Sequence, residues 1–135
     1  MPNETIVFPD ATLAAVTAIR AGLTAASSTA TVGTRVPNPR PALFAVVRRI
    51  GGVRRNLVTD SAQLSVECWG ATEQTAHDLA QLCRGIIHAA QGTDQGGTVV
   101  YWVAEIGGPA LLADPESDLP RYVATYEIGT RGTAV

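Results

Sequence analysis

Lysine is missing from this sequence of 135 residues: all ten basic residues are arginine, set against twelve acidic residues, for a formal net charge of −2. Every cation is therefore a planar guanidinium, which suits bidentate contacts with a carboxylate or a phosphate. Charged residues make up 16% of the chain, less than the roughly 25% usual in soluble domains. This low charge content favours surfaces buried between subunits, although abundant alanine, glycine and threonine account for part of it.

Other absences exclude whole classes of function. Two cysteines are too few for a disulfide framework, so we expect Cys68 and Cys83 to be reduced and buried. The N-terminus has no signal-peptide pattern, and no apolar run is long enough to span a membrane. The cysteines and the two histidines, His77 and His88, form no CxxC or HxxxH pair, and no GxSxG, GK[ST] or HExxH motif occurs. We therefore expect no metal, no cofactor and no enzymatic activity.

Two segments have the periodicity of amphipathic helices. The first, residues 10–23, begins at Asp10, and the second, residues 72–91, begins at Thr72; both residues are good N-caps. The expected apolar stripes comprise Leu13, Val16, Ile19 and Leu23 in the first helix, and Ala76, Leu79, Ala80, Cys83, Ile86, Ile87 and Ala90 in the second.

Runs rich in β-formers indicate the sheet, and the loop before the last of them carries Asp114 and Glu116, which we assign to solvent. A two-glycine step, Gly51-Gly52, predicts the tight turn of a hairpin. The order of elements predicts an α+β fold, a single domain over residues 1–135 with a largely antiparallel sheet and two helices packed on one face. The strand regions are a hairpin at 42–58 and strands at 62–69, 98–106 and 121–131.

Four arginines surround that glycine pair. If the turn has two residues, Arg49 pairs with Arg54 and Arg48 with Arg55, so that one arginine pair projects from each face. Like charges opposite one another destabilise a hairpin by up to about 1 kcal/mol, and no partner lies nearby in the sequence. We therefore predict that Arg48, Arg49, Arg54 and Arg55 bind acidic groups of a partner protein; the simpler alternative is a solvated tip that protects an edge.

Charge is also divided unevenly along the chain. Residues 1–60 hold seven arginines and three acids, whereas residues 61–135 hold three arginines and nine acids. Subunits with two such surfaces associate head to tail, and the association closes into a ring when the rotation between neighbours divides a full turn.

Several stretches resemble the tail terminator proteins of long-tailed, siphovirus-type bacteriophages, in particular those of phages with GC-rich actinobacterial hosts. The most specific are "VPNPRP", "RRIGGVRRNLVTD" and "DPESDLPRY", within a similarity that covers residues 34–132. The resemblance implies a structural virion protein that forms a hexameric ring, caps the tail tube, ends its polymerisation and provides the docking surface for the head–tail connector. It supplies no catalytic residue and no contact residues.

The implied partners are other copies of the chain, the tail tube protein and a connector or neck protein, while genomic DNA passes through the lumen without sequence-specific binding. The implied location is the head-proximal end of the virion tail, and the host cytoplasm during assembly. Two alternatives remain: a nucleic-acid-binding module that uses the same arginines, and another neck or head-completion protein. The negative net charge and the lack of aromatic residues among the arginines count against the first.

Overall fold

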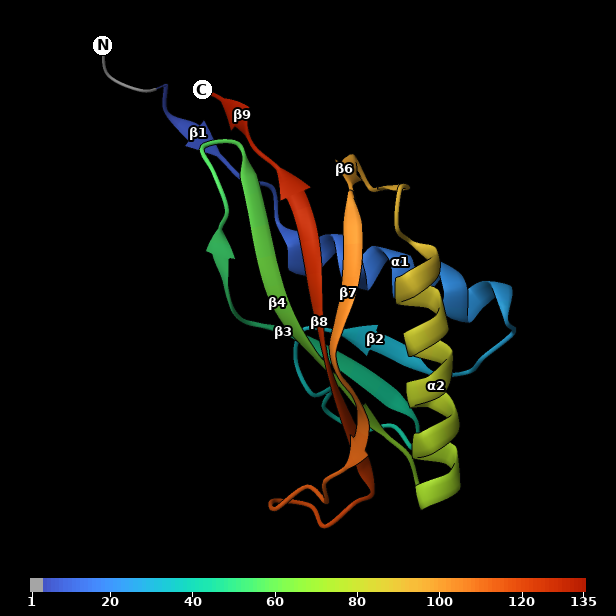
Figure 1. Ribbon diagram of the computed structural model, residues 1–135. Coiled ribbons are helices and arrows are strands. Elements are labelled where there is room, and N and C mark those ends of the chain that lie inside the picture. The colour runs from blue at the N-terminus through green and yellow to red at the C-terminus, as the bar shows by residue number, and fades with distance from the viewer. Residues whose placement is uncertain (1–3) are drawn as a thin grey trace.

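The computed structural model describes residues 4–135 and is shown in Figure 1. Two helices and several strands follow one another in the order expected of an α+β chain. These elements are β1 (Ile6–Val7), α1 (Ala11–Ala25), β2 (Thr31–Gly33), β3 (Phe44–Arg54), β4 (Thr59–Trp69), α2 (Glu73–Ala89), β5 (Asp94–Gln95), β6 (Thr98–Val99), β7 (Trp102–Leu111), β8 (Arg121–Arg131) and β9 (Thr133–Ala134).

A five-stranded sheet in the order β2-β3-β4-β8-β7 is the main layer. Its neighbours are antiparallel except for β2 and β3, which are parallel. Both helices contact the same face of this sheet and each other, and the upper parts of β4 and β8 extend beyond them (Figure 1). The predicted α+β fold, with a largely antiparallel sheet and both helices on one face, is confirmed.

Helix α1 covers the sheet mainly with small residues. Asp10 caps its first turn by accepting a 3.0 Å hydrogen bond from the Leu13 amide. The helix predicted at 10–23 is observed at Ala11–Ala25, but the prediction that Leu13 faces the core is wrong, because its side chain is 58% exposed. Alanines supply much of the buried surface of α1. The face of the helix that contacts the sheet is centred on them, and Leu13 lies outside that face. The buried residues are Ala11, Ala14, Ala15, Val16, Ala18, Ile19 and Leu23.

Helix α2 begins with a capping box, in which Thr72 and Thr75 bond each other's backbone amides. It is observed at Glu73–Ala89, against a prediction of 72–91. Its apolar stripe is buried as expected except at Ile86, which is partly buried and packs against α1. Gly22 of α1 permits this approach, because a Cβ atom there would lie 2.5 Å from the Ile86 side chain.

The hydrophobic core lies between the helices and the sheet. Alternate residues of β4, including Leu64, Val66 and Cys68, point into it. Cys68 and Cys83 are both buried and free. On the other face, Phe44, Val46 and Trp69 form a second, smaller cluster, covered by the loops that contain Val36 and Leu119. The sheet therefore has one face under the helices and one open face covered only near its lower end.

The predicted hairpin at 42–58 with its turn at Gly51-Gly52 is wrong. β3 runs through both glycines as far as Arg54, and the hairpin is formed by β3 and β4. The glycines serve a β-bulge, where the register shifts between Arg49 and Gly51. Both have positive φ, and a Cβ atom on Gly52 would lie 2.1 Å from the Ser61 carbonyl oxygen. The close approach of β3 and β4 therefore requires glycine at position 52, which we had assigned to a turn.

The actual turn of this hairpin is built by Asn56. Its side-chain oxygen accepts a 3.0 Å hydrogen bond from the Val58 amide, and the Arg55 amide donates to the Thr59 carbonyl at 2.9 Å. Consequently β4 begins at Thr59, three residues before the strand predicted at 62–69.

The two C-terminal strand predictions differ in outcome. β8 occupies Arg121–Arg131, the predicted range, whereas the segment predicted as one strand at 98–106 divides into β6 and β7. β7 continues to Leu111 through two register shifts between Glu105 and Ala110, so that it accommodates Pro109 without pairing every residue.

Candidate functional site

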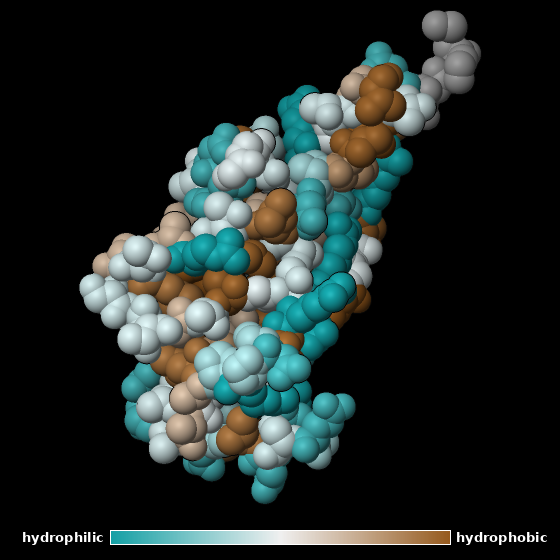
Figure 2. Space-filling model, turned by 180° about the vertical axis from the view of Figure 1, so that it is seen from behind, coloured by the Kyte–Doolittle hydropathy of each residue, from teal (hydrophilic) through white to brown (hydrophobic). Residues whose placement is uncertain are grey.

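The outer half of β3 carries the arginine cluster. We call residues 48–55 the arginine edge. Each of these residues is exposed, on both faces of the strand, whereas the first four residues of β3 are buried. Exposed apolar side chains include Val53 on this edge, Val7 on β1 and Val135 after β9, and Figure 2 shows hydrophobic surface toward the upper end of the molecule.

Two of the arginines lie on the face that the helices cover further down. Arg49 is opposite Leu64 and Arg54 is opposite Asp60. The Arg49 guanidinium donates to the Asp60 carboxylate at 3.0 Å and to the Gly51 carbonyl at 3.1 Å. Arg54 instead donates to the carbonyls of the turn, 2.6 Å from the Leu57 oxygen, and lies over the Phe8 ring. These contacts join the bulge, the turn and the N-terminal segment.

The other two arginines reach the open face of the sheet. Arg48 lies 3.7 Å from the carboxylate of Glu67, and Arg55 donates to Glu127 at 2.6 Å. The Arg55 guanidinium also lies over the ring of Trp102. Glu127 accepts a second hydrogen bond, from the Ser61 hydroxyl, so its negative charge is shared between the turn after β3 and strand β4.

The predicted arginine pairs do not form, because the strand continues past the glycines and each arginine is opposite a residue of β4 or lies in the turn. We expected no partner nearby in the sequence, and the fold supplies partners from further along the chain: three members of the cluster contact a carboxylate. The side chains nevertheless keep between 39% and 55% exposure in those three pairs. Binding of a partner protein by these four arginines stays a prediction.

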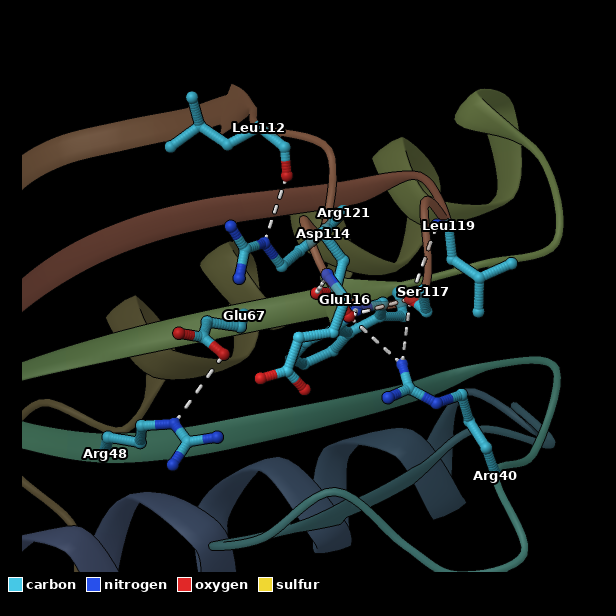
Figure 3. Close-up of polar contacts among 10 residues, drawn as sticks. Arg40, Arg48, Glu67, Leu112, Asp114, Glu116, Ser117, Leu119 and Arg121 are labelled. Carbon is cyan, nitrogen blue, oxygen red and sulfur yellow. Dashed lines mark hydrogen bonds and ion pairs between the residues drawn. The ribbon is translucent and has the colours of Figure 1, made fainter.

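A second charged site, at the lower end of the open face, is drawn in Figure 3. Asp114 is buried, contrary to our assignment of this residue to solvent. Its carboxylate accepts hydrogen bonds from the Trp69 indole at 3.0 Å, from Arg40 at 3.2 Å and from the Ser117 hydroxyl at 2.8 Å. The Glu116 amide donates to the other oxygen at 3.0 Å. We call this arrangement the Asp114 clamp.

The hydrogen bonds at the clamp stabilise a charged carboxylate. They hold the pKa of Asp114 well below its usual range, the Glu116 amide having the largest effect, followed by Ser117, with Trp69 and Arg40 adding to it against the opposing effect of burial. The sequence signal for this anchor is "DPES", in which an aspartate bonds the backbone two residues ahead and a hydroxyl three residues ahead.

Planar groups stack beside the clamp. The Phe44 and Trp69 rings are parallel within 12°, with centroids 4.7 Å apart. Arg40 lies over Phe44 and Arg121 over Trp69, so that two guanidinium groups enclose two rings. A cavity of 210 Å³ opens next to this stack. Its lining contains equal numbers of arginines and acids, namely Arg40, Arg48, Arg121, Glu67, Asp114 and Glu116, and this balance gives no excess positive charge for a phosphate.

Helix α2 is tied to β7 by a further ion pair. Arg84 donates two hydrogen bonds to Glu105, at 2.6 and 2.8 Å, and His88 lies 3.6 Å from the same carboxylate. The bond from Arg84 lowers the pKa of Glu105 and raises that of Arg84. This contact is exposed to solvent at the side of α2. It connects α2 and β7, which also pack against each other through the hydrophobic core.

The structure does not assemble a reactive centre from the remaining candidate residues. In residues 4–135, no group of three or more histidine, cysteine or acidic side chains is placed to hold a metal ion. A hydrogen bond with Cys83, together with burial, raises the pKa of Cys68 well above its usual range, which disfavours a reactive thiolate. None of the helices in this described part is long and apolar enough to cross a membrane.

The fold defined by these elements, two helices over one face of a largely antiparallel sheet, is shared with a chain of a solved virion. That chain belongs to a structure described as "Virion of native gene transfer agent (GTA) particle". The two superpose with a TM-score of 0.62 at 12% sequence identity, over 92% of this chain and 100% of that one. At this identity the likeness shows a common fold. No protein-family model matches the sequence, and no curated protein matches it.

Proposed function

We propose that this chain is a structural protein of a bacteriophage or a phage-related particle, and more specifically a tail terminator. In this role six copies form a ring that caps the tail tube, ends its polymerisation and presents a docking surface to the head–tail connector. The observation that carries the proposal is the fold shared with a chain of a gene transfer agent virion over nearly the whole length of both chains. The motifs "VPNPRP" and "DPESDLPRY" support the narrower assignment.

The charged groups of the structure support a role in assembly rather than in catalysis. The carboxylates of Asp114, Asp60 and Glu105 each contact an arginine, and these contacts hold strands, loops and a helix together. Such pairs stabilise a scaffold, and the three acids that line the 210 Å³ cavity are matched there by three arginines. The negative net charge of the chain disfavours the nucleic-acid module, because binding to nucleic acid depends on excess positive charge.

The proposal is tested by removing the gene for this chain from the phage that encodes it. Negative-stain images of the resulting particles are expected to show overlong tail tubes without heads, and supply of the wild-type chain is expected to restore tail length. Tails of normal length that merely lack heads would instead indicate a head-completion or neck protein. A reconstruction of the intact virion would show six-fold rings at the head-proximal end of the tail, whereas a two-fold dimer there would contradict the ring.

A further inference from the structure

The sheet has one uncovered backbone edge. β2 is the strand on the outer side of β3, and its register covers only Phe44–Val46. Val47 is buried, and the backbone beyond it, residues 48–54 of β3, pairs with β4 on its inner side and forms the left margin of the molecule in Figure 1. Within residues 4–135 no strand pairs with this outer side. Unpaired peptide groups in such a row are a template for another strand.

The opposite edge of the sheet is obstructed by comparison. β7 carries Pro109, which lacks an amide hydrogen, and two register shifts that bend the strand. Gln91 caps this edge as well, because its side-chain oxygen accepts a 2.9 Å hydrogen bond from the Val103 amide. Proline, bulges and caps are the devices by which natural sheets prevent unwanted pairing. β7 combines the proline, two register shifts and the cap, whereas β3 has one bulge, between Arg49 and Gly51, and continues as regular strand at residues 52–54.

Charge identifies what fits the open edge. Arg48 and Val53 belong to its open face, and Arg49 and Arg54 to the other face, as their partners on β4 show. A second copy pairing through the same edge would bring these arginines against one another, which is destabilising. A second copy that paired its β7 with this edge would have to use a strand whose own edge is obstructed, so this pairing is disfavoured as well. A strand that carries carboxylates on both faces satisfies the backbone and the arginines together.

We propose that an extended, acidic segment of a different protein adds to the sheet along residues 48–54 of β3. Main-chain hydrogen bonds supply the affinity, as in other cases of strand addition. The exposed Ile50 and Val53 contact apolar side chains of the segment, while Arg48 and Arg54 bind its carboxylates. The inference rests on the proposed function in one respect, that the chain docks to a neighbouring virion protein, and it names the surface and the chemistry of that partner.

A defined peptide tests the chemistry on the purified full chain. The probe is a nine-residue peptide that alternates valine with aspartate and glutamate; the matched probe has lysine and arginine in place of the acids. Hydrogen exchange is expected to slow by at least about ten-fold at the outward-facing amides of residues 48–54 with the acidic probe and to stay unchanged with the basic one. Equal protection by both probes, protection of β7 instead, or none at millimolar peptide would overturn the proposal.

Matched variants separate charge at the edge from total charge. Arg48→Gln with Arg54→Gln is expected to weaken binding of the acidic probe by at least about ten-fold, because two charge-assisted contacts are lost. Arg20→Gln with Arg84→Gln removes the same charge from the two helices and is expected to leave that affinity unchanged. An equal loss in both double variants would show only long-range attraction and contradict strand addition at β3. The circular dichroism spectrum of each variant checks that it is folded.

A photo-cross-linking residue at Val53 identifies the occupant in assembled particles, with Ile106 on β7 as the control position. A covalent product between position 53 and a peptide of another polypeptide, rich in aspartate or glutamate, is expected. A product between two copies of this chain at position 53 would overturn the proposal. Normal tails after gene removal together with an acidic cross-linked partner would refute the terminator role alone. Overlong tails with no product at position 53 would refute strand addition alone.

Discussion

Arginine meets carboxylate at both ends of the sheet, and the two ends differ in how far water reaches these charges. At the Asp114 clamp, the side chain of Arg40 is 29% exposed and that of Asp114 only 8%. At the arginine edge, Arg55 is 55% exposed although its contact with Glu127 is shorter. An exposed pair contributes about 0–1 kcal/mol, whereas a buried carboxylate depends on its donors. The clamp therefore fixes a loop, and the edge keeps its guanidinium groups accessible.

The largest expected effect comes from breaking the clamp. Asp114→Ala removes the acceptor of the Trp69, Arg40 and Ser117 donors, and it is expected to lower the free energy of unfolding by about 3 kcal/mol, because breaking a buried, hydrogen-bonded pair typically costs this much. Urea denaturation of the variant and the wild type measures the difference. A loss below about 1 kcal/mol would show that the clamp behaves like an exposed pair.

A slightly smaller effect is expected from the bulge that positions the arginine edge. Gly52→Ala introduces a Cβ atom 2.1 Å from the Ser61 carbonyl oxygen at a residue with positive φ, so β3 and β4 must separate locally. We expect a loss of about 2 kcal/mol. Gly51→Ala is the control, because no atom lies within 4 Å of its Cβ position and only the backbone strain remains. Equal losses from the two changes would indicate that the close approach to Ser61 contributes nothing.

The arginine edge is itself divided between structural and accessible arginines. Arg49→Gln leaves the buried Asp60 carboxylate without its guanidinium donor, and we expect a loss of about 1–2 kcal/mol. Arg48→Gln breaks only a 3.7 Å contact with Glu67, and we expect a change below about 0.5 kcal/mol. Melting temperatures of both variants measure which substitution destabilises the chain more. A larger loss of stability for Arg48→Gln than for Arg49→Gln would contradict the prediction. The structure thus corrects our sequence-based expectation that removal of these arginines would relieve repulsion.

The effect of pH on the clamp is expected to be only a part of the loss caused by Asp114→Ala, because the lowered pKa keeps the carboxylate charged in the folded chain down to about pH 3. The pKa of Asp114 is lowered in the folded chain, so the stability that its carboxylate provides is complete above the unfolded pKa of about 3.9 and is lost as the pH falls toward the folded pKa. The difference in stability between the wild type and Asp114→Asn is therefore expected to narrow below about pH 4. Urea titrations at pH 7, 4 and 3 measure it, and a constant difference would contradict the lowered pKa.

Prediction from the sequence worked where interactions are local. Asp10 and Thr72 bond amides within the next turn, so they define the starts of both helices without reference to the rest of the chain. The alternation of Leu64, Val66 and Cys68 likewise follows from strand geometry alone. Leu13 is the exception in the helices, because neighbouring alanines pack more closely against the sheet and decide which face is buried.

Long-range pairing decided what the candidate sites are. A glycine pair suits both a turn and a bulge, and only the position of Ser61 on β4 makes Gly52 part of a bulge. Glu127 lies 72 residues from Arg55, and Asp114 lies 74 residues from Arg40, so neither contact has a local sequence signal. The sequence by itself determined the helices, their caps and the concentration of arginine near residue 50. The tertiary structure determined which arginines are neutralised and which backbone edge is left open, because both depend on strands that are distant in sequence and adjacent in the sheet.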